Sequence, residues 1–193
     1  MKYVMFGLAC LAILLAFIFG SSYYKKQQAD KYDFLAKENS STFIRDHSPT
    51  LGSDDAKVFL IKFTDPACET CAAFDPFVKQ IMNAYPGKIK LVIRYTPFHD
   101  GADYFVKILE ASKKQGKYWE TMDIMYWSHS FWASHHNPQP QLIWQFLPKV
   151  GLYIEQIKQD MIDPAIVKII QQDLADAKTL NVLKTPGFFV NGK

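Results

Sequence analysis

Two cysteines, Cys68 and Cys71, lie three positions apart in the stretch Asp65–Pro76, which reads DPACETCAAFDP. Such a pair suits a redox-active dithiol, one half of a metal site, or a structural disulfide. A disulfide at this spacing closes a very short loop, so as a structural link it would stabilise the fold little. A zinc site needs about four ligands, and no histidine shows paired spacing with the cysteines. The spacing therefore favours a working dithiol, with a metal site as the alternative.

The expected start of a helix at this pair also suits thiol–disulfide exchange. A cysteine at a helix N-terminus has its thiolate stabilised by backbone N–H groups and by the helix dipole. The second thiol of such a pair can then resolve a mixed disulfide formed between the first thiol and a substrate.

The flanking segments predict the elements that position the pair. Val58–Phe63 (VFLIKF) is a nearly unbroken apolar run, as expected of a strand buried on both faces. Residues from Phe74 to about Tyr85 place apolar side chains on one helical face, and Lys88–Tyr95 (KIKLVIRY) predicts a second strand. This order favours two parallel strands joined by a right-handed crossover.

From Gly101 to about Leu180 the apolar spacing is helical, and Asp163 with Pro164 predicts the start of the last helix. Thr185-Pro186 then precedes a short predicted strand, Gly187–Val190. A proline that enters a strand is well suited to a cis X-Pro turn.

In this order the segments resemble the DsbA-like thiol–disulfide oxidoreductases, which have a helical domain inserted in a thioredoxin fold. The resemblance rests on SPTLGSDDAKVFLIKFTDPACETCAAF, RYTPFHDGADYFVKILEASKKQGKYWE and TPGFFVNGK. It implies an α/β thioredoxin-like domain over residues 48–193, with the insertion over about 101–180. It also implies an enzyme that exchanges protein disulfides and needs no cofactor or metal.

The resemblance implies a role for each matching residue. Cys68 would be the exposed nucleophile and Cys71 the buried resolving thiol. Pro186 would be the cis-proline beside them, and Thr185 would present backbone groups to an extended substrate peptide.

The dipeptide between the cysteines is Glu69-Thr70, where strongly oxidising members of the family usually have Pro-His. A carboxylate beside the thiolate should raise the pKa of Cys68 relative to a histidine. A less stabilised thiolate makes a couple less oxidising. Glu69 and Thr70 are therefore expected to tune the redox potential away from a DsbA-strength oxidant, and the direction of electron flow stays open.

The N-terminal segment Val4–Gly20 has no charged residue and includes Cys10 as an apolar filler. As a helix it spans about 25 Å, slightly less than a bilayer core. It predicts, within residues 1–22, either an uncleaved signal anchor, which its length favours, or a cleaved signal peptide. Both place the domain on the periplasmic side of a Gram-negative envelope, with an anchor holding it at the inner membrane. Residues 23–47 predict a linker or an association helix for oligomers.

Apolar residues make up 49% of the 193 residues, enough for the core of one domain, and the net charge is only +3. The scattered lysines indicate no nucleic-acid surface. Expected partners are protein thiol and disulfide substrates and a membrane redox partner. Because family members continue past Lys193 with a strand and a helix, we expect this sequence to be truncated.

Two other functions fit parts of this pattern. One is an envelope protein that binds copper or zinc through Cys68, Cys71 and a histidine. The other is a redox-inactive thioredoxin-fold module that binds peptides beside Pro186.

Overall fold

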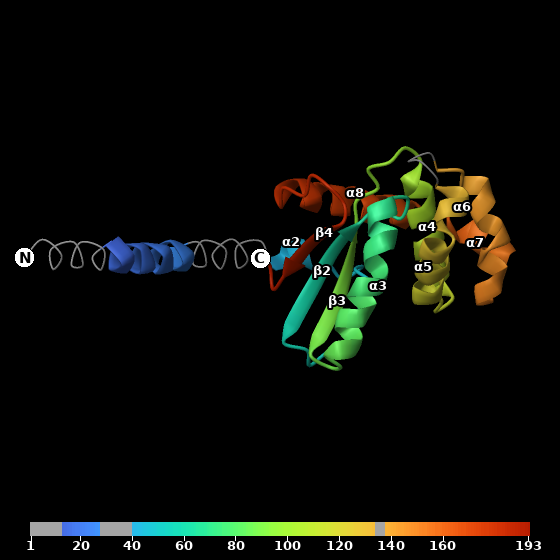
Figure 1. Cartoon of the computed structure of the whole chain (residues 1–193). Helices are drawn as coiled ribbons and strands as arrows, with labels where there is room; N and C mark the ends of the chain where they lie inside the picture. Colours follow the sequence, from blue (N-terminus) through green and yellow to red (C-terminus); the bar gives the residue numbers. More distant parts are fainter. Residues whose placement is uncertain (1–12, 28–39, 134–137) are drawn as a thin grey trace, which may run out of the picture. The chain divides into compact units, whose positions relative to one another are not determined.

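A four-stranded mixed sheet forms the centre of the domain (Figure 1). The computed structural model describes residues 13–27, 40–133 and 138–193. Within them the strand order is β1-β3-β2-β4. The strands are β1 Thr50–Leu51, β2 Val58–Thr64, β3 Ile89–Tyr95 and β4 Gly187–Val190. β2 and β3 pair in parallel, whereas β1 and β4 are antiparallel to their neighbours, so β4 forms one edge of the sheet.

The predicted strand–helix–strand unit is confirmed, including the start of the helix at the cysteine pair. Helix α3, Glu69–Ala84, joins β2 to β3 and begins at the cysteine pair, as expected there, five residues before the apolar face that starts at Phe74. The reason is local: Cys68 is the N-cap residue, and its sulfur accepts a hydrogen bond from the Cys71 backbone N–H. The cysteine pair is therefore part of the first helical turn.

Helices fill the chain between β3 and β4, as the apolar spacing predicts. The α-helices are α4 Ala102–Lys114, α5 Tyr118–Trp127, α6 His129–Trp132, α7 Ile154–Asp160 and α8 Pro164–Thr179. Two 3₁₀ helices, Pro140–Gln145 and Leu147–Val150, lie between α6 and α7 along the chain. Asp163 caps α8 as predicted, because its side chain accepts a hydrogen bond from the Ala165 N–H.

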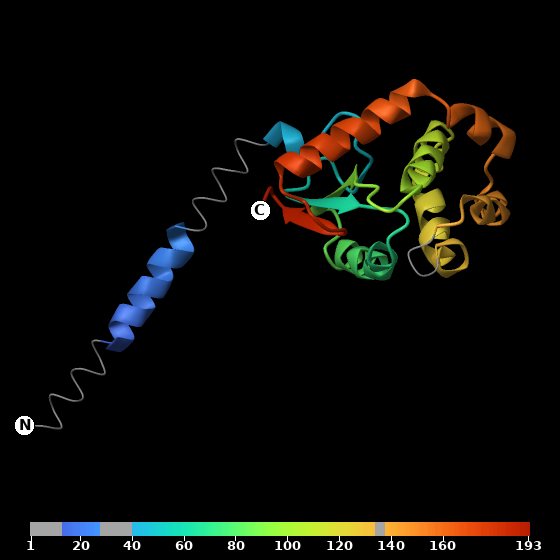
Figure 2. The same ribbon diagram turned by 90° about the horizontal axis from the view of Figure 1, so that it is seen from above.

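The sheet lies between α3 and α8, which cover opposite faces (Figure 2). On the α8 side, Ile61 and Phe63 of β2 pack with Val92 of β3 and with Phe43 from the short helix α2, Ser40–Phe43. Alternate residues of the same strands face the other way, as the pleat of a strand requires.

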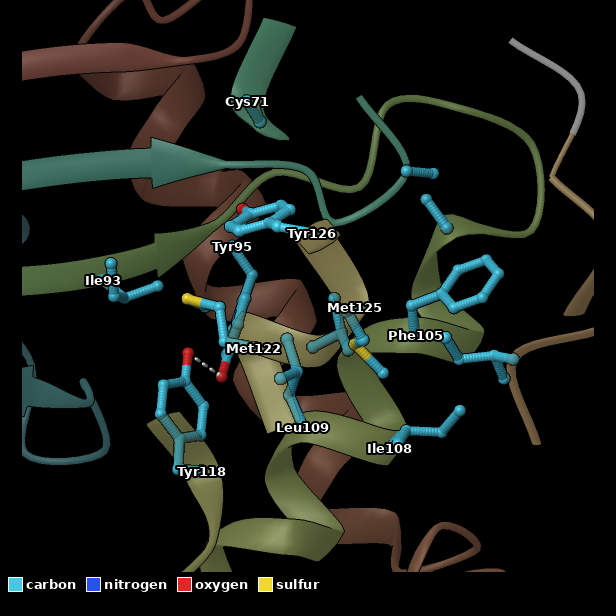
Figure 3. Close-up of a cluster of buried hydrophobic side chains, with 14 of the residues drawn as sticks. Cys71, Ile93, Tyr95, Phe105, Ile108, Leu109, Tyr118, Met122, Met125 and Tyr126 are labelled. Carbon is cyan, nitrogen blue, oxygen red and sulfur yellow. Dashed lines mark hydrogen bonds between the residues drawn. The ribbon is translucent and has the colours of Figure 1, made fainter. Parts of the chain in front are cut away.

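On the α3 side the strands share one core with the inserted helices (Figure 3). Ile93 and Tyr95 of β3 meet Phe105, Leu109, Met122 and Met125 of α4 and α5 in this cluster. Cys71 belongs to the same cluster, as does Tyr126 at the end of α5. The insertion is thus packed directly against the cysteine pair.

A buried ion-pair network joins β3 to α8. The Arg94 side chain is fully buried and donates to Asp173 at 2.7 Å and to Asp176 at 2.5 Å. Asp176 also accepts two hydrogen bonds from Arg45, and Asp173 lies 2.7 Å from the His47 ring. These contacts attach the segment before β1 to both elements.

The N-terminal part forms a unit distinct from the domain, and residues 13–27 of it are helical. Among the residues described, no helix is both long enough and apolar enough to cross a bilayer. Residues 4–12 of the expected membrane segment and 28–39 of the expected linker lie outside the described residues. Membrane anchoring and association through this part stay predictions.

We expect Arg94→Met to destabilise the domain by about 3–5 kcal/mol, because it leaves Asp173 and Asp176 buried without their main cation. Urea unfolding followed by circular dichroism measures the change. Lys158→Met is the control, since it removes an ion pair with Glu155 that is exposed to solvent and should cost no more than about 1 kcal/mol. Equal losses in the two variants would contradict a structural role for the buried network.

Candidate active site

The cysteine pair lies where β2 ends and α3 begins. Both cysteines are free thiols in the structure. Cys71 is 0% exposed and Cys68 is 5% exposed. The expectation of an exposed nucleophile is therefore wrong in degree: Cys68 is the more accessible sulfur, but it too is largely covered. Part of this cover is the Thr185 carbonyl, 3.5 Å from the Cys68 sulfur.

The chain returns to the cysteines just before β4. The Thr185–Pro186 peptide bond is cis, which confirms that prediction. When Cys68 is protonated, its thiol can donate to the Thr185 carbonyl. The structure thus brings together Cys68, Cys71, Thr185 and Pro186, which are far apart in the sequence.

The two thiols have opposite acidities. A hydrogen bond from the Cys71 thiol lowers the pKa of Cys68 to about 5, against the effect of burial. The Thr185 side chain and the backbone at Cys71 and Thr70 lower this pKa further. Donation to the Cys68 sulfur raises the pKa of Cys71 well above its ordinary value, and burial raises it further. At neutral pH the site therefore holds a Cys68 thiolate beside a Cys71 thiol.

The residues between the cysteines, Glu69 and Thr70, both lie exposed on the first turn of α3. The Thr70 backbone contributes to the low pKa of Cys68. The effect of Glu69 relative to a histidine at the same place stays a prediction.

Asp65 fixes the loop that carries the nucleophile. Its buried carboxylate accepts hydrogen bonds from the backbone N–H of Ala67 at 2.8 Å, of Phe98 at 2.8 Å and of His99 at 2.9 Å. The His99 ring lies 2.8 Å from the same carboxylate. The loop after β3 is thereby tied to the loop before Cys68, a link between distant segments that the sequence pattern does not show.

Lys62 is the functional candidate that the sequence pattern missed. Its side chain is 1% exposed, and its Nζ lies 3.5 Å from Asp75 Oδ1 and 4.9 Å from the centre of the Tyr126 ring. Burial lowers the pKa of Lys62, against the attraction of Asp75 and of nearby Cys71. The sequence signal for this candidate was a lysine inside the apolar run VFLIKF. Burying a charge costs free energy unless the charge is paired, so a lysine in a buried strand indicates a specific role.

A hydrogen-bonded pair of hydroxyls lies beside the resolving thiol. Tyr126 OH and Thr64 Oγ1 are 2.7 Å apart, and the Thr64 side chain also hydrogen-bonds Cys71. No group of three or more histidine, cysteine or acidic side chains is close enough to hold a metal ion in the described part of the chain.

A dithiol at the start of the helix after a central strand, with a cis-proline opposite, defines a thioredoxin-like protein. A family model described as thioredoxin matches residues 45–193, and the chain belongs to this family. The curated Na(+)/H(+) antiporter NhaA of Herminiimonas arsenicoxydans is 27% identical over 142 residues, which are 74% of this chain and 22% of that protein. The chain therefore spans only about a fifth of this relative.

Solved structures agree on the fold. A thioredoxin-like oxidoreductase from Silicibacter pomeroyi DSS-3 is 27% identical, with a TM-score of 0.68 over 78% of this chain and 83% of that one. The thiol-disulfide exchange protein alpha-DsbA2 from Wolbachia pipientis is 19% identical, with a TM-score of 0.73 over 86% and 88%. The resemblance to DsbA-like proteins inferred from the sequence is confirmed at the level of the fold.

The acidity of Cys68 predicts how its alkylation depends on pH. Since the thiolate is the reactive form, the rate of iodoacetamide modification of the reduced protein should rise with pH and reach half its maximum near pH 5. Of the two cysteines of the site, peptide mapping should find the modification on Cys68. In Cys71→Ala the midpoint should move upward, because the main stabilising hydrogen bond is gone. A wild-type midpoint near the ordinary value of 9.0 would contradict this description.

Proposed function

We propose that the protein is a thiol–disulfide oxidoreductase that exchanges disulfides with other proteins through Cys68 and Cys71. The observation that carries the proposal is a Cys68 sulfur of low pKa at the start of α3, next to Cys71, whose backbone N–H donates a hydrogen bond to that sulfur. Family membership and the similar fold of a thiol-disulfide exchange protein support it.

In the reducing direction, the Cys68 thiolate attacks one sulfur of a substrate disulfide. A Cys68–substrate disulfide forms, and the other substrate sulfur leaves as a thiolate and takes up a proton. Cys71 then loses its proton and attacks the Cys68 sulfur, which forms the Cys68–Cys71 disulfide and releases the second substrate thiolate. Two electrons pass from the dithiol to the substrate.

In the oxidising direction the same steps run backward. A substrate thiolate attacks Cys68 in the Cys68–Cys71 disulfide, and Cys71 leaves as a thiolate that takes up a proton. A second substrate thiolate attacks the substrate sulfur of the mixed disulfide and releases Cys68. The substrate disulfide forms, and the protein dithiol keeps the two electrons.

The acidity of Cys68 supports a couple of intermediate strength. A more stable thiolate makes the reduced form more stable and the couple more oxidising. A pKa of about 5 for Cys68 lies between the values of about 7 for thioredoxin and about 3.5 for DsbA. We therefore expect a weaker oxidant than DsbA. A measurement of the reduction potential of the Cys68–Cys71 couple would decide the direction of electron flow.

The proposed location is the periplasmic side of the cell envelope, with residues 4–20 as the anchor and a membrane redox partner that regenerates the couple. The apolar N-terminal segment supports this part. Thr185 and Pro186 are proposed to bind the substrate backbone, which their position beside the Cys68 sulfur supports.

The two cysteine variants separate the proposed roles. Cys68→Ser should abolish both insulin reduction and the oxidation of a dithiol peptide, because no nucleophile remains. Cys71→Ser should accumulate mixed disulfides on Cys68, visible as adducts that a reductant removes, because the resolving thiol is gone. Activity in Cys68→Ser, or the absence of adducts in Cys71→Ser, would contradict the mechanism.

Lys62 is expected to assist the second step. Its buried charge favours the Cys71 thiolate, so Lys62→Met should slow the resolution of a preformed mixed disulfide by up to about tenfold, equivalent to one pKa unit. The alkylation rate of Cys68 should change less. Lys79→Met is the matched control, because Lys79 also pairs with Asp75 but is half-exposed. Equal slowing in both variants would assign the effect to Asp75 instead.

A further inference from the structure

A pocket of about 360 Å³ lies beside the nucleophile, between the first turns of α3 and the junction of α5 with α6. Glu69 and Ala72 form its α3 side, and Tyr126, Trp127 and His129 form the other. Glu69 follows Cys68 directly in the sequence. A group bound in this pocket therefore lies close to the reactive Cys68 sulfur. The exchange mechanism gives this pocket no role.

His129 is the most informative residue in this pocket. It is 5% exposed, and its Nε2 has no hydrogen-bond partner. The Ala67 backbone acts on the ring as a hydrogen-bond acceptor and raises its pKa, and because Nε2 has no partner we assign this contact to Nδ1. Burial lowers the pKa of His129, which keeps the ring neutral. In a neutral ring whose Nδ1 donates, Nε2 is an unused acceptor.

The other lining groups also favour a positively charged donor. The Glu69 side chain brings a carboxylate to the same pocket, and the Trp127 ring is 66% exposed. Lys149 Nζ lies 5.3 Å from the centre of the Trp127 ring, so this indole already attracts one cation of the chain itself. A carboxylate ligand would meet Glu69 and find no donor at Nε2, whereas a cation with N–H groups matches both acceptors and the aromatic wall.

We propose that this pocket is a substrate subsite for a basic side chain, arginine above lysine, that flanks the reacting cysteine of the substrate protein. Arginine fits best because its planar guanidinium has several donors and stacks on aromatic rings. The inference rests on the proposed exchange function and adds a substrate preference to it. Cys68, Cys71 and Thr185 supply the reactivity, and this pocket selects among substrates.

The test uses three reduced peptides that differ only in the residues on both sides of one cysteine, which are Arg, Gln or Glu. The oxidised protein is mixed with each peptide, and the rate constant for opening the Cys68–Cys71 disulfide is measured. The quantity compared between protein variants is the ratio of the Arg-peptide rate to the Glu-peptide rate. This comparison cancels the intrinsic reactivity of each peptide and any change in the redox potential of a variant.

Glu69→Lys should lower this ratio by about tenfold or more, the effect of losing about 1.4 kcal/mol of preference. Glu69→Gln should lower it less, and His129→Phe should lower it without changing the net charge, because it removes the Nε2 acceptor. Glu155→Lys is the matched control, since it makes the same charge change on α7, away from the pocket. The ratio should stay at the wild-type value there.

The outcomes distinguish the substrate subsite from the exchange function. A ratio that falls in Glu69→Lys and not in Glu155→Lys supports the subsite. Equal falls in both variants, or no dependence on the flanking residue in the wild type, would overturn it while leaving the exchange function intact. Absence of reaction with all three peptides would contradict the exchange function itself. Because Glu69 is exposed, its variants keep the test decisive even if His129→Phe does not fold.

Discussion

The hydrogen bond between the Cys71 thiol and the Cys68 sulfur is the interaction on which the site depends. It makes one sulfur a stable thiolate and keeps the other protonated, so the two thiols are chemically distinct before any substrate arrives. The two sulfurs lie together because Cys68 is the N-cap of α3, where its sulfur also accepts a hydrogen bond from the Cys71 backbone N–H. The end of β2 and the hydrogen bonds of Asp65 set this position. Cys71 is buried in the core shared with the insertion (Figure 3). This burial raises the pKa of Cys71 further and so increases the difference in acidity between the two thiols.

The two faces of the sheet carry buried cations with different consequences. Arg94, on the α8 face, has two carboxylates at hydrogen-bonding distance, so its desolvation is compensated and its role is structural. Lys62, on the face of the cysteines, has one carboxylate at 3.5 Å and an aromatic ring. Burial lowers the pKa of this weakly paired amine, and its remaining charge favours the thiolate form of the neighbouring Cys71.

Most of the framework could be predicted from local patterns, and the parts that could not depend on distant contacts. Apolar runs predicted β2, β3 and β4, and Asp163-Pro164 predicted the start of α8, because each signal lies within a few neighbouring residues. The two-residue strand β1 and the helix α2 are too short to show a period. The link from Asp65 to His99, and the pocket that His129 shares with the first turn of α3, involve segments whose proximity only the folded chain reveals.

Reactivity and selectivity come from different parts of this chain, and that separation has a physical reason. The sheet, α3 and the turn before β4 hold the sulfurs rigidly, because small displacements of Cys68 or Cys71 would change both acidities. The inserted helices touch this centre through Tyr126 and line its approach with Trp127 and His129. Side chains exchanged on that approach alter which substrate residue is accommodated, while the Cys71 hydrogen bond stays in place. An insertion is therefore a place where substrate preference can change while the thiol chemistry is preserved.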